Sequence, residues 1–145
     1  MNDFLRSVKP AFEFLVSQRG YHLLSEDVSP SFDNGQLVYA STAVRIVVTR
    51  DRGQVFFSAS ACGDPRDVDD EILALLIDGV KAYPTEPAPR DFSADGSASI
   101  LHRRLSSIEQ LLSPSRLEAT LRNAGALQGQ RAHVLFGATR PVDRS

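Results

Sequence analysis

Three histidines and one cysteine are the side chains of this chain that could act as bases, nucleophiles or metal ligands. His22, His102 and His133 stand far apart, and no carboxylate or cysteine lies at ligand spacing beside them. Cys62 precedes Gly63 at the end of a strand-like run, with no histidine near it in the sequence. A nucleophile and its base need to meet only in space, so an enzyme site assembled by tertiary structure stays open. We expect surface or half-buried histidines, a buried cysteine, and no catalytic residue, metal or cofactor.

The densest charge feature is a group of five carboxylates: Asp64, Asp67, Asp69, Asp70 and Glu71. Together they could dock a basic protein such as a nuclease, because a surface of one charge steers an oppositely charged partner. Carboxylates also suit the first turn of a helix, where they oppose the positive end of its dipole. We favour this structural interpretation, with Asp67 as the N-cap, and keep all five residues as candidate partner contacts. The spacing is not that of a calcium-binding loop.

Composition argues against nucleic-acid and membrane partners. The 145-residue chain has a formal net charge of -2 and a pI near 5.9, so it has no global basic field. Four arginines that could contact phosphate (Arg103, Arg104, Arg116 and Arg122) alternate with glutamates and lack aromatic neighbours, which is typical of a solvated helix face. No apolar run is long enough to span a bilayer, and the single cysteine forbids an internal disulfide. We expect a cytoplasmic protein.

A β-hairpin over residues 43–61 is the best-specified structure in the sequence. Apolar residues alternate with others on both sides of an Arg-Asp-Arg-Gly segment, the period of a strand with one buried face. A three-residue loop would place serines opposite core residues. We therefore predict a four-residue loop, residues 50–53, which pairs Val48 with Val55, Ile46 with Phe57 and Val44 with Ala59.

The remaining pattern predicts one α+β domain over residues 1–136, followed by a flexible tail at 137–145. An N-terminal helix is expected over about residues 3–17, with Pro10 either kinking it or starting its main part. Strands are expected at 21–28 and 36–41. Further helices are expected from Asp67 to Val80, over 98–112, and from Ser113 to about Gly125, with a proline-rich loop at 84–96. Residues 133–136 read as a short fifth strand or a packed extension. The expected architecture is a four-stranded antiparallel meander with an N-terminal helix and a C-terminal helical portion packed on the sheet.

The second face of the hairpin carries one apolar pair, Val47 and Phe56, which are opposite one another in the predicted register. If helices pack only on the face of Val44, Ile46 and Val48, this pair is exposed and marks a partner or dimer surface. If helices cover both faces, the pair belongs to the peripheral core. The sequence leaves both alternatives open, and both residues are candidate partner contacts.

The first half of the chain, to Ile77, resembles a group of small uncharacterised bacterial proteins. The resemblance rests on Phe14-Leu15, on Gly20-Tyr21, on Phe32 with Asn34, and on the Arg-Asp-Arg-Gly hairpin at residues 50–53. The sequence Asp33-Asn34-Gly35 departs from the turn sequence that is usual in the group. Proteins of this kind are similar to the immunity proteins that accompany bacterial polymorphic toxins. The resemblance implies a small, cytosolic, non-enzymatic α+β domain that neutralises a toxin by binding it.

The expected function is therefore protein binding, with a toxin encoded by a neighbouring gene as the partner. The alternative is a homodimer, or an adaptor or regulatory subunit, that acts through the Val47–Phe56 face. An enzyme whose residues converge only in three dimensions is the third interpretation.

Overall fold

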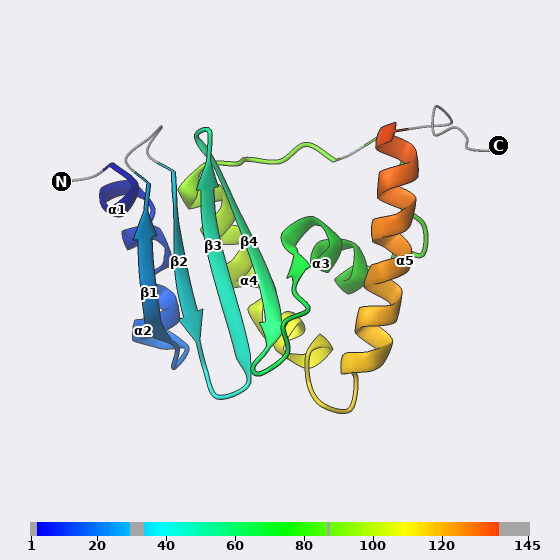
Figure 1. The fold of residues 1–145 in the computed structure, drawn as a ribbon, viewed down its shortest axis with the longest axis horizontal. Helices are drawn as coiled ribbons and strands as arrows, with labels where there is room; N and C mark the ends of the chain where they lie inside the picture. The colour runs from blue at the N-terminus through cyan, green and yellow to red at the C-terminus, as the bar shows by residue number, and fades with distance from the viewer. Residues whose placement is uncertain (1–2, 30–33, 87, 137–145) are drawn as a thin grey trace.

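The computed structural model describes residues 3–29, 34–86 and 88–136. Within them the chain forms one antiparallel sheet of five strands in the order β1-β2-β3-β4-β5 (Figure 1). The strands are β1 (His22–Val28), β2 (Gly35–Ala40), β3 (Val44–Asp51), β4 (Gln54–Ala61) and β5 (Val68–Asp69). The predicted α+β class and antiparallel meander are confirmed, but the predicted count of four strands is wrong. Two residues are too short to show a period, so β5 left no pattern in the sequence.

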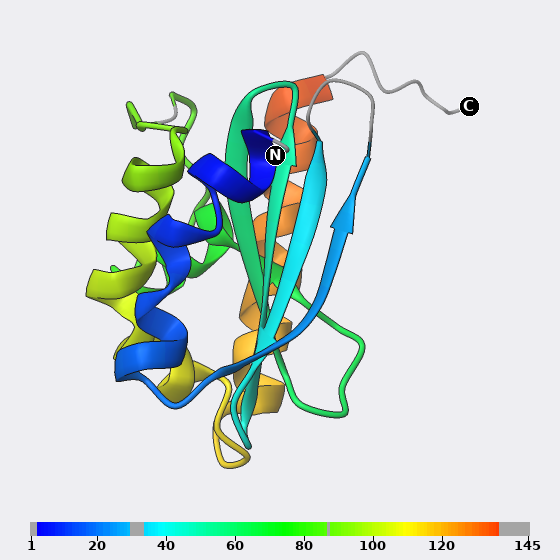
Figure 2. The ribbon, with the colours of Figure 1, turned by 90° about the vertical axis from the view of Figure 1, so that its left-hand side faces the viewer.

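The helices of residues 3–29, 34–86 and 88–136 cover one face of the long strands. α1 (Asp3–Ser7), the 3₁₀ helix η1 (Pro10–Phe12), α2 (Phe14–Gln18) and α4 (Ala94–Leu111) lie behind the sheet in Figure 1 and to its left in Figure 2. α3 (Asp70–Ile77) follows β5 at the sheet edge, and α5 (Leu117–Phe136) packs against α3 beyond that edge. In the described part of the chain, no helix covers the other face of β1, β2 and β3.

The core lies between the sheet and these helices. Val44, Ile46 and Val48 are at most 1% exposed, and Leu101 and Leu105 of α4 are fully buried. Each strand thus presents alternate residues to the helices, as the period of two requires. The face of β3 that the sequence predicted to be buried, with Val44, Ile46 and Val48, therefore packs in the core.

The N-terminal segment is broken at Pro10, within the range that the sequence predicted as helical. Pro10 has no N–H to donate to the preceding turn, so α1 ends at Ser7 and a short 3₁₀ turn follows. Phe4, Phe12 and Leu15 are nevertheless fully buried. The apolar spacing therefore identified the buried residues correctly, and the expected interruption at Pro10 divides the segment into two short α-helices and a 3₁₀ turn.

The hairpin register differs by two residues from the prediction. Val48 pairs with Phe57, Ile46 with Ala59 and Val44 with Ala61. The loop holds only Arg52 and Gly53, whose φ angles of 54° and 82° match a tight two-residue turn with two left-handed residues. A shift of two leaves every side chain on its predicted face, so burial could not distinguish the two registers.

After β4, three predicted helix boundaries differ from the observed ones. The N-cap of α3 is Asp69, not Asp67, because the Asp69 carboxylate accepts the N–H of Ile72. α4 begins at Ala94, four residues earlier than predicted. α5 continues through Gly125 to Phe136, which excludes the predicted helix end and, of the two alternatives for residues 133–136, the short strand. The predicted tail at 137–145 and Phe32 lie outside the described residues.

The buried face of α5 explains why Gly125 does not end it. Thr120, Ala124 and Leu127 lie one helical turn apart and are at most 4% exposed. Burial of this face outweighs the roughly 1 kcal/mol that a glycine costs inside a helix.

Candidate functional site

Two carboxylates at the start of α3, those of Asp69 and Glu71, share one arginine of α5. Arg131 donates from Nη2 to Asp69 Oδ2 at 2.8 Å and from Nη1 to Glu71 Oε1 at 3.0 Å. The hydroxyl of Tyr83 donates to Glu71 Oε2 at 2.8 Å. Burial, with this bond, raises the pKa of Tyr83 to about 12. Asp69 and Glu71 therefore join α3 to α5 and to the loop after α3.

Asp70 points into the protein and is 5% exposed. Its Oδ2 accepts the backbone N–H of Phe57 at 3.0 Å and Nη1 of Arg90 at 2.8 Å. Burial raises the pKa of Asp70, and the bonds from Phe57 and Arg90 oppose that effect. Because it is buried and paired, Asp70 cannot contact a docked protein without rearrangement.

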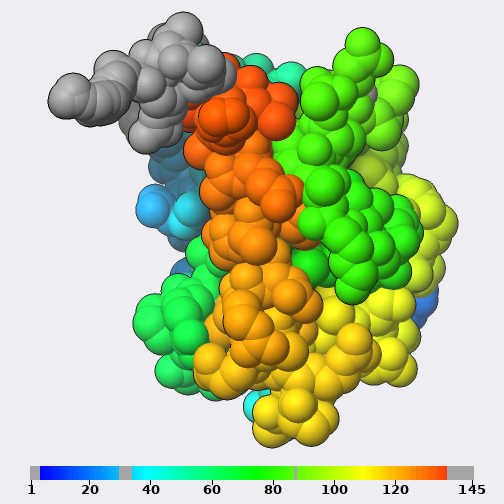
Figure 3. All heavy atoms as spheres, turned by 90° about the vertical axis from the view of Figure 1, so that its right-hand side faces the viewer, coloured from blue at the N-terminus to red at the C-terminus, as the bar shows by residue number. Residues whose placement is uncertain are grey.

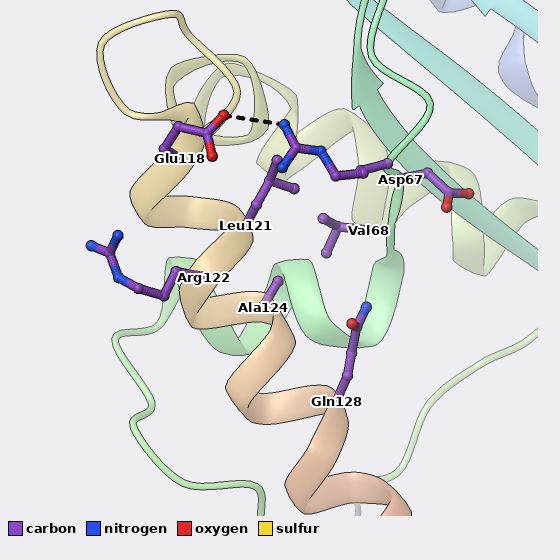
Figure 4. A pocket seen from close by; sticks show the side chains of 8 residues that line it. Asp67, Val68, Glu118, Leu121, Arg122, Ala124 and Gln128 are labelled. Atoms are coloured by element: carbon purple, nitrogen blue, oxygen red, sulfur yellow. Dashed lines mark hydrogen bonds and ion pairs between the residues drawn. The ribbon is translucent and has the colours of Figure 1, made fainter.

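Asp64 is held by its neighbour Arg66, which donates to both carboxylate oxygens at 3.0 and 2.7 Å. These bonds lower the pKa of Asp64 to about 2. Arg66 also donates to Glu118 of α5 at 3.1 Å, the contact drawn as a dashed line in Figure 4. Asp67, by contrast, is exposed and makes no ion pair among the described residues.

An open cleft of about 590 Å³ lies between this loop and α5 (Figure 4). Figure 3 shows α5 running along the middle of this side of the molecule. The cleft is lined by Arg66, Asp67, Val68, Glu118, Leu121, Arg122, Ala124 and Gln128. Charges of both signs therefore border it. The five predicted acidic contacts do not form one acidic surface, and Asp67 is the member best placed to meet a partner.

The second candidate site is the face of the sheet turned away from α1, α2 and α4, here named the open face. Val38 and Val47 are paired at its centre, and Val47 also pairs with Ser58. Val38 is 7% exposed and Val47 is half-buried, while Gln36 and Arg45 at the border are exposed. The alternative in which helices pack only on the Val44–Val48 side is the one observed for β1 to β3.

Val47 and Phe56 are not opposite each other, because the observed register pairs Phe56 with Thr49. The Phe56 ring packs against Phe92, with 5.3 Å between the ring centroids, and lies 5.9 Å from the Arg90 guanidinium. Phe56 is thus partly covered by the segment before α4. Val47 remains on the uncovered part of the open face.

The three histidines and the cysteine, which are the candidate reactive groups of the sequence, do not form a cluster in the described residues. His22 is exposed on β1, His133 is exposed on α5, and His102 lies against Phe14 with 4.6 Å between ring centroids. Cys62 is exposed, which contradicts the prediction of a buried cysteine, because it lies in the connection that leaves β4. In residues 3–29, 34–86 and 88–136, no three His, Cys, Asp or Glu side chains gather as a metal site would require. No helix in those ranges is long and apolar enough to cross a membrane.

Sequence reasoning missed the two arginines that organise this region. Arg90 sits among prolines in a segment interpreted as a loop, and Arg131 lies beyond the expected end of its helix. A single basic residue in either context carries no periodic signal. The ion pairs of Arg90 with Asp70 and of Arg131 with Asp69 form only in the folded structure, where distant segments of the chain meet.

Comparison of the chain with protein-family models, with curated proteins and with solved structures gives no match.

Proposed function

We propose that this protein is a non-enzymatic binding domain that recognises a protein partner through the open face of its sheet. The observation that supports the proposal is the one-sided arrangement of the layers: among the residues that the structure describes, no helix covers that face of β1, β2 and β3 (Figure 2). Its centre holds the half-buried Val47 beside Val38, which is only 7% exposed, and its border is polar. An apolar centre with a polar rim is the usual anatomy of a protein interface.

The class of partner comes from the resemblance of the first half of the chain to immunity proteins. On that basis the partner is a toxin encoded by a neighbouring gene, neutralised by direct binding. Asp67 lies near β5, outside the centre of the open face, and gives a basic toxin one exposed carboxylate to contact. The electrostatic attraction between this surface and a basic toxin is therefore weaker than five clustered carboxylates would give.

Genetic rescue tests the toxin proposal. The gene is deleted alone and together with each adjacent reading frame, and growth is measured in pure culture and in competition with wild-type cells. A single deletion that grows poorly, and that recovers when one neighbour is also removed, supports an antidote whose toxin is that neighbour. Normal growth and competition of the single deletion would contradict it.

A homodimer or adaptor is the second candidate, supported by the exposed edge of the sheet at β1. Leu24 is 60% exposed at the irregularity between Leu23 and Ser25, and an edge strand offers unpaired backbone groups to another chain. Analytical ultracentrifugation over a range of concentrations tests the dimer. A monomer at high concentration that is unchanged by Leu24→Glu would exclude self-association through this edge.

A further inference from the structure

Residues 88–93, here named the strap, meet the outer edge of β4 at Val55 before α4 begins. The carbonyl oxygen of Phe92 accepts the N–H of Val55 at 2.8 Å. β5 pairs with β4 only at Ser58 and Ala59, so the strap takes the place of a neighbouring strand beside Val55. The strap thereby caps backbone groups that would otherwise lie at an open sheet edge.

Arg90 supplies most of the side-chain contacts of the strap. Its Nη1 donates to Asp70 Oδ2 at 2.8 Å, and its Nη2 donates to Ser97 Oγ at 2.6 Å and to the carbonyl of Val55 at 3.2 Å. The hydroxyl of Ser97 in turn donates to the same Val55 carbonyl at 2.5 Å. One guanidinium therefore ties the strap to α3, to α4 and to β4.

Stacking completes the attachment on the open-face side. The guanidinium carbon of Arg90 lies 4.5 Å from the centroid of the Phe92 ring, and that ring packs on Phe56. The other strap side chains, those of Ala88, Pro89, Asp91 and Ser93, are exposed. The Nε of Arg90 is buried and has no hydrogen-bond partner within the described part of the chain. The strap is thus held on β4 by Arg90 and Phe92, and Ser93 at its end caps α4 by accepting the N–H of Gly96.

We propose that the strap is a releasable cap, latched by Arg90, that covers Phe56 and the backbone edge of β4 and opens without unfolding the sheet. Segments with few buried contacts open at lower free energy than the core they rest on. Opening would leave the N–H of Val55 unpaired at a sheet edge, while its carbonyl would keep the bond from Ser97, and would uncover the Phe56 ring beside the open face. The device does not depend on the identity of any partner.

Hydrogen exchange of single backbone amides, followed by NMR at increasing denaturant, tests the latch in the full-length protein. In the wild type we expect the Val55 amide to exchange with little dependence on denaturant, as in local opening, while amides of β2 and β3 exchange through global unfolding. Arg90→Gln should speed exchange at Val55 by about ten- to a hundredfold, since charged hydrogen bonds are lost. Arg90→Lys, which keeps the charge but not the planar fork, should give a smaller increase.

Arg104→Gln is the matched control, because it removes an exposed arginine pair with Asp78 that does not touch the strap. It should leave exchange at Val55 within about twofold of the wild type. Chymotrypsin cleavage after Phe92 should likewise accelerate in Arg90→Gln and not in the control. The proposal is overturned if Val55 exchanges only with global unfolding in the wild type and in both Arg90 variants. A dependence of Val55 exchange on denaturant in Arg90→Gln as steep as that of β2 and β3 would also overturn it, since Val55 would then be exposed only when the whole fold opens.

Discussion

The guanidinium of Arg90 and the carboxylate of Asp70 lie 2.8 Å apart, Nη1 to Oδ2, and join the segment before α4 to the first turn of α3. Their side chains are 16% and 5% exposed, which makes this the most buried ion pair in the described part of the chain. Asp70 also accepts the Phe57 N–H at the outer edge of β4. An ion pair that holds three segments together at a sheet edge should affect stability and local motion differently according to which partner is removed.

Replacement of Arg90 by methionine should destabilise the protein by about 3–5 kcal/mol at neutral pH, because it leaves a buried carboxylate without its cation. Asp70→Asn should have a smaller effect, since an amide oxygen can still accept the Phe57 N–H and Arg90 keeps partial access to water. Urea unfolding of the two variants measures the difference. Equal losses in the two variants would contradict the asymmetry.

The pH dependence of stability should report Asp70 directly. Burial raises its pKa above the ordinary value of 3.8, so the folded protein binds this proton more tightly than the unfolded chain. Ionisation of Asp70 therefore lowers stability as the pH rises from 3.8 through the raised pKa. We expect the wild type to gain stability relative to Asp70→Asn as the pH falls from about 7 to about 4. A constant difference between the two unfolding free energies would show that this carboxyl titrates normally.

Two glycines of the chain should respond oppositely to alanine. Gly53 has a φ of 82° in the hairpin turn, where a Cβ is strained, so Gly53→Ala should cost about 1 kcal/mol. Gly125 lies inside α5 with no atom within 4 Å of an added Cβ, so Gly125→Ala should stabilise by about 0.5–1 kcal/mol. Thermal unfolding of each variant checks both signs. Destabilisation by Gly125→Ala would contradict a continuous α5.

The open face should be sensitive to a buried charge if it binds a partner. We expect Val47→Glu to weaken capture of a partner identified by the rescue experiment by at least about tenfold, because an interface centre tolerates no unpaired carboxylate. Ser99→Glu adds the same charge at an exposed position of α4, on the opposite side of the sheet, and should leave capture unchanged. Circular dichroism and a melting curve confirm that both variants fold. Full affinity of a folded Val47→Glu protein would remove the open face from the proposal.

Asp67 offers a separate test of the electrostatic contribution. Asp67→Lys reverses an exposed charge that makes no ion pair among the described residues, so it should leave stability within about 0.5 kcal/mol. With a basic partner it should slow association and reduce the dependence of association on salt. Stopped-flow kinetics at low and high salt measure this effect. Reversal at Asp70 would be uninformative, because a lysine there would disrupt the buried pair with Arg90.

Periodicity alone determined which face of each strand is buried. Val44, Ile46 and Val48 share a face because successive side chains alternate along a strand, and burial of those residues follows from their apolarity. The same argument placed Phe4, Phe12 and Leu15 in the core even though Pro10 breaks their helix. These inferences depend only on neighbours in the chain, so the sequence contains what they need.

The tertiary structure decided the pairings and therefore the candidate sites. Registers that differ by two residues bury the same side chains, and only the left-handed turn at Arg52 and Gly53 selects between them. The acidic cluster loses its single-signed surface because Arg90 and Arg131 arrive from distant segments, and Coulombic pairing depends on distance in space and not on separation in sequence. For the same reason, only the packing of α4 and the N-terminal helices on one side shows which face of the sheet is open.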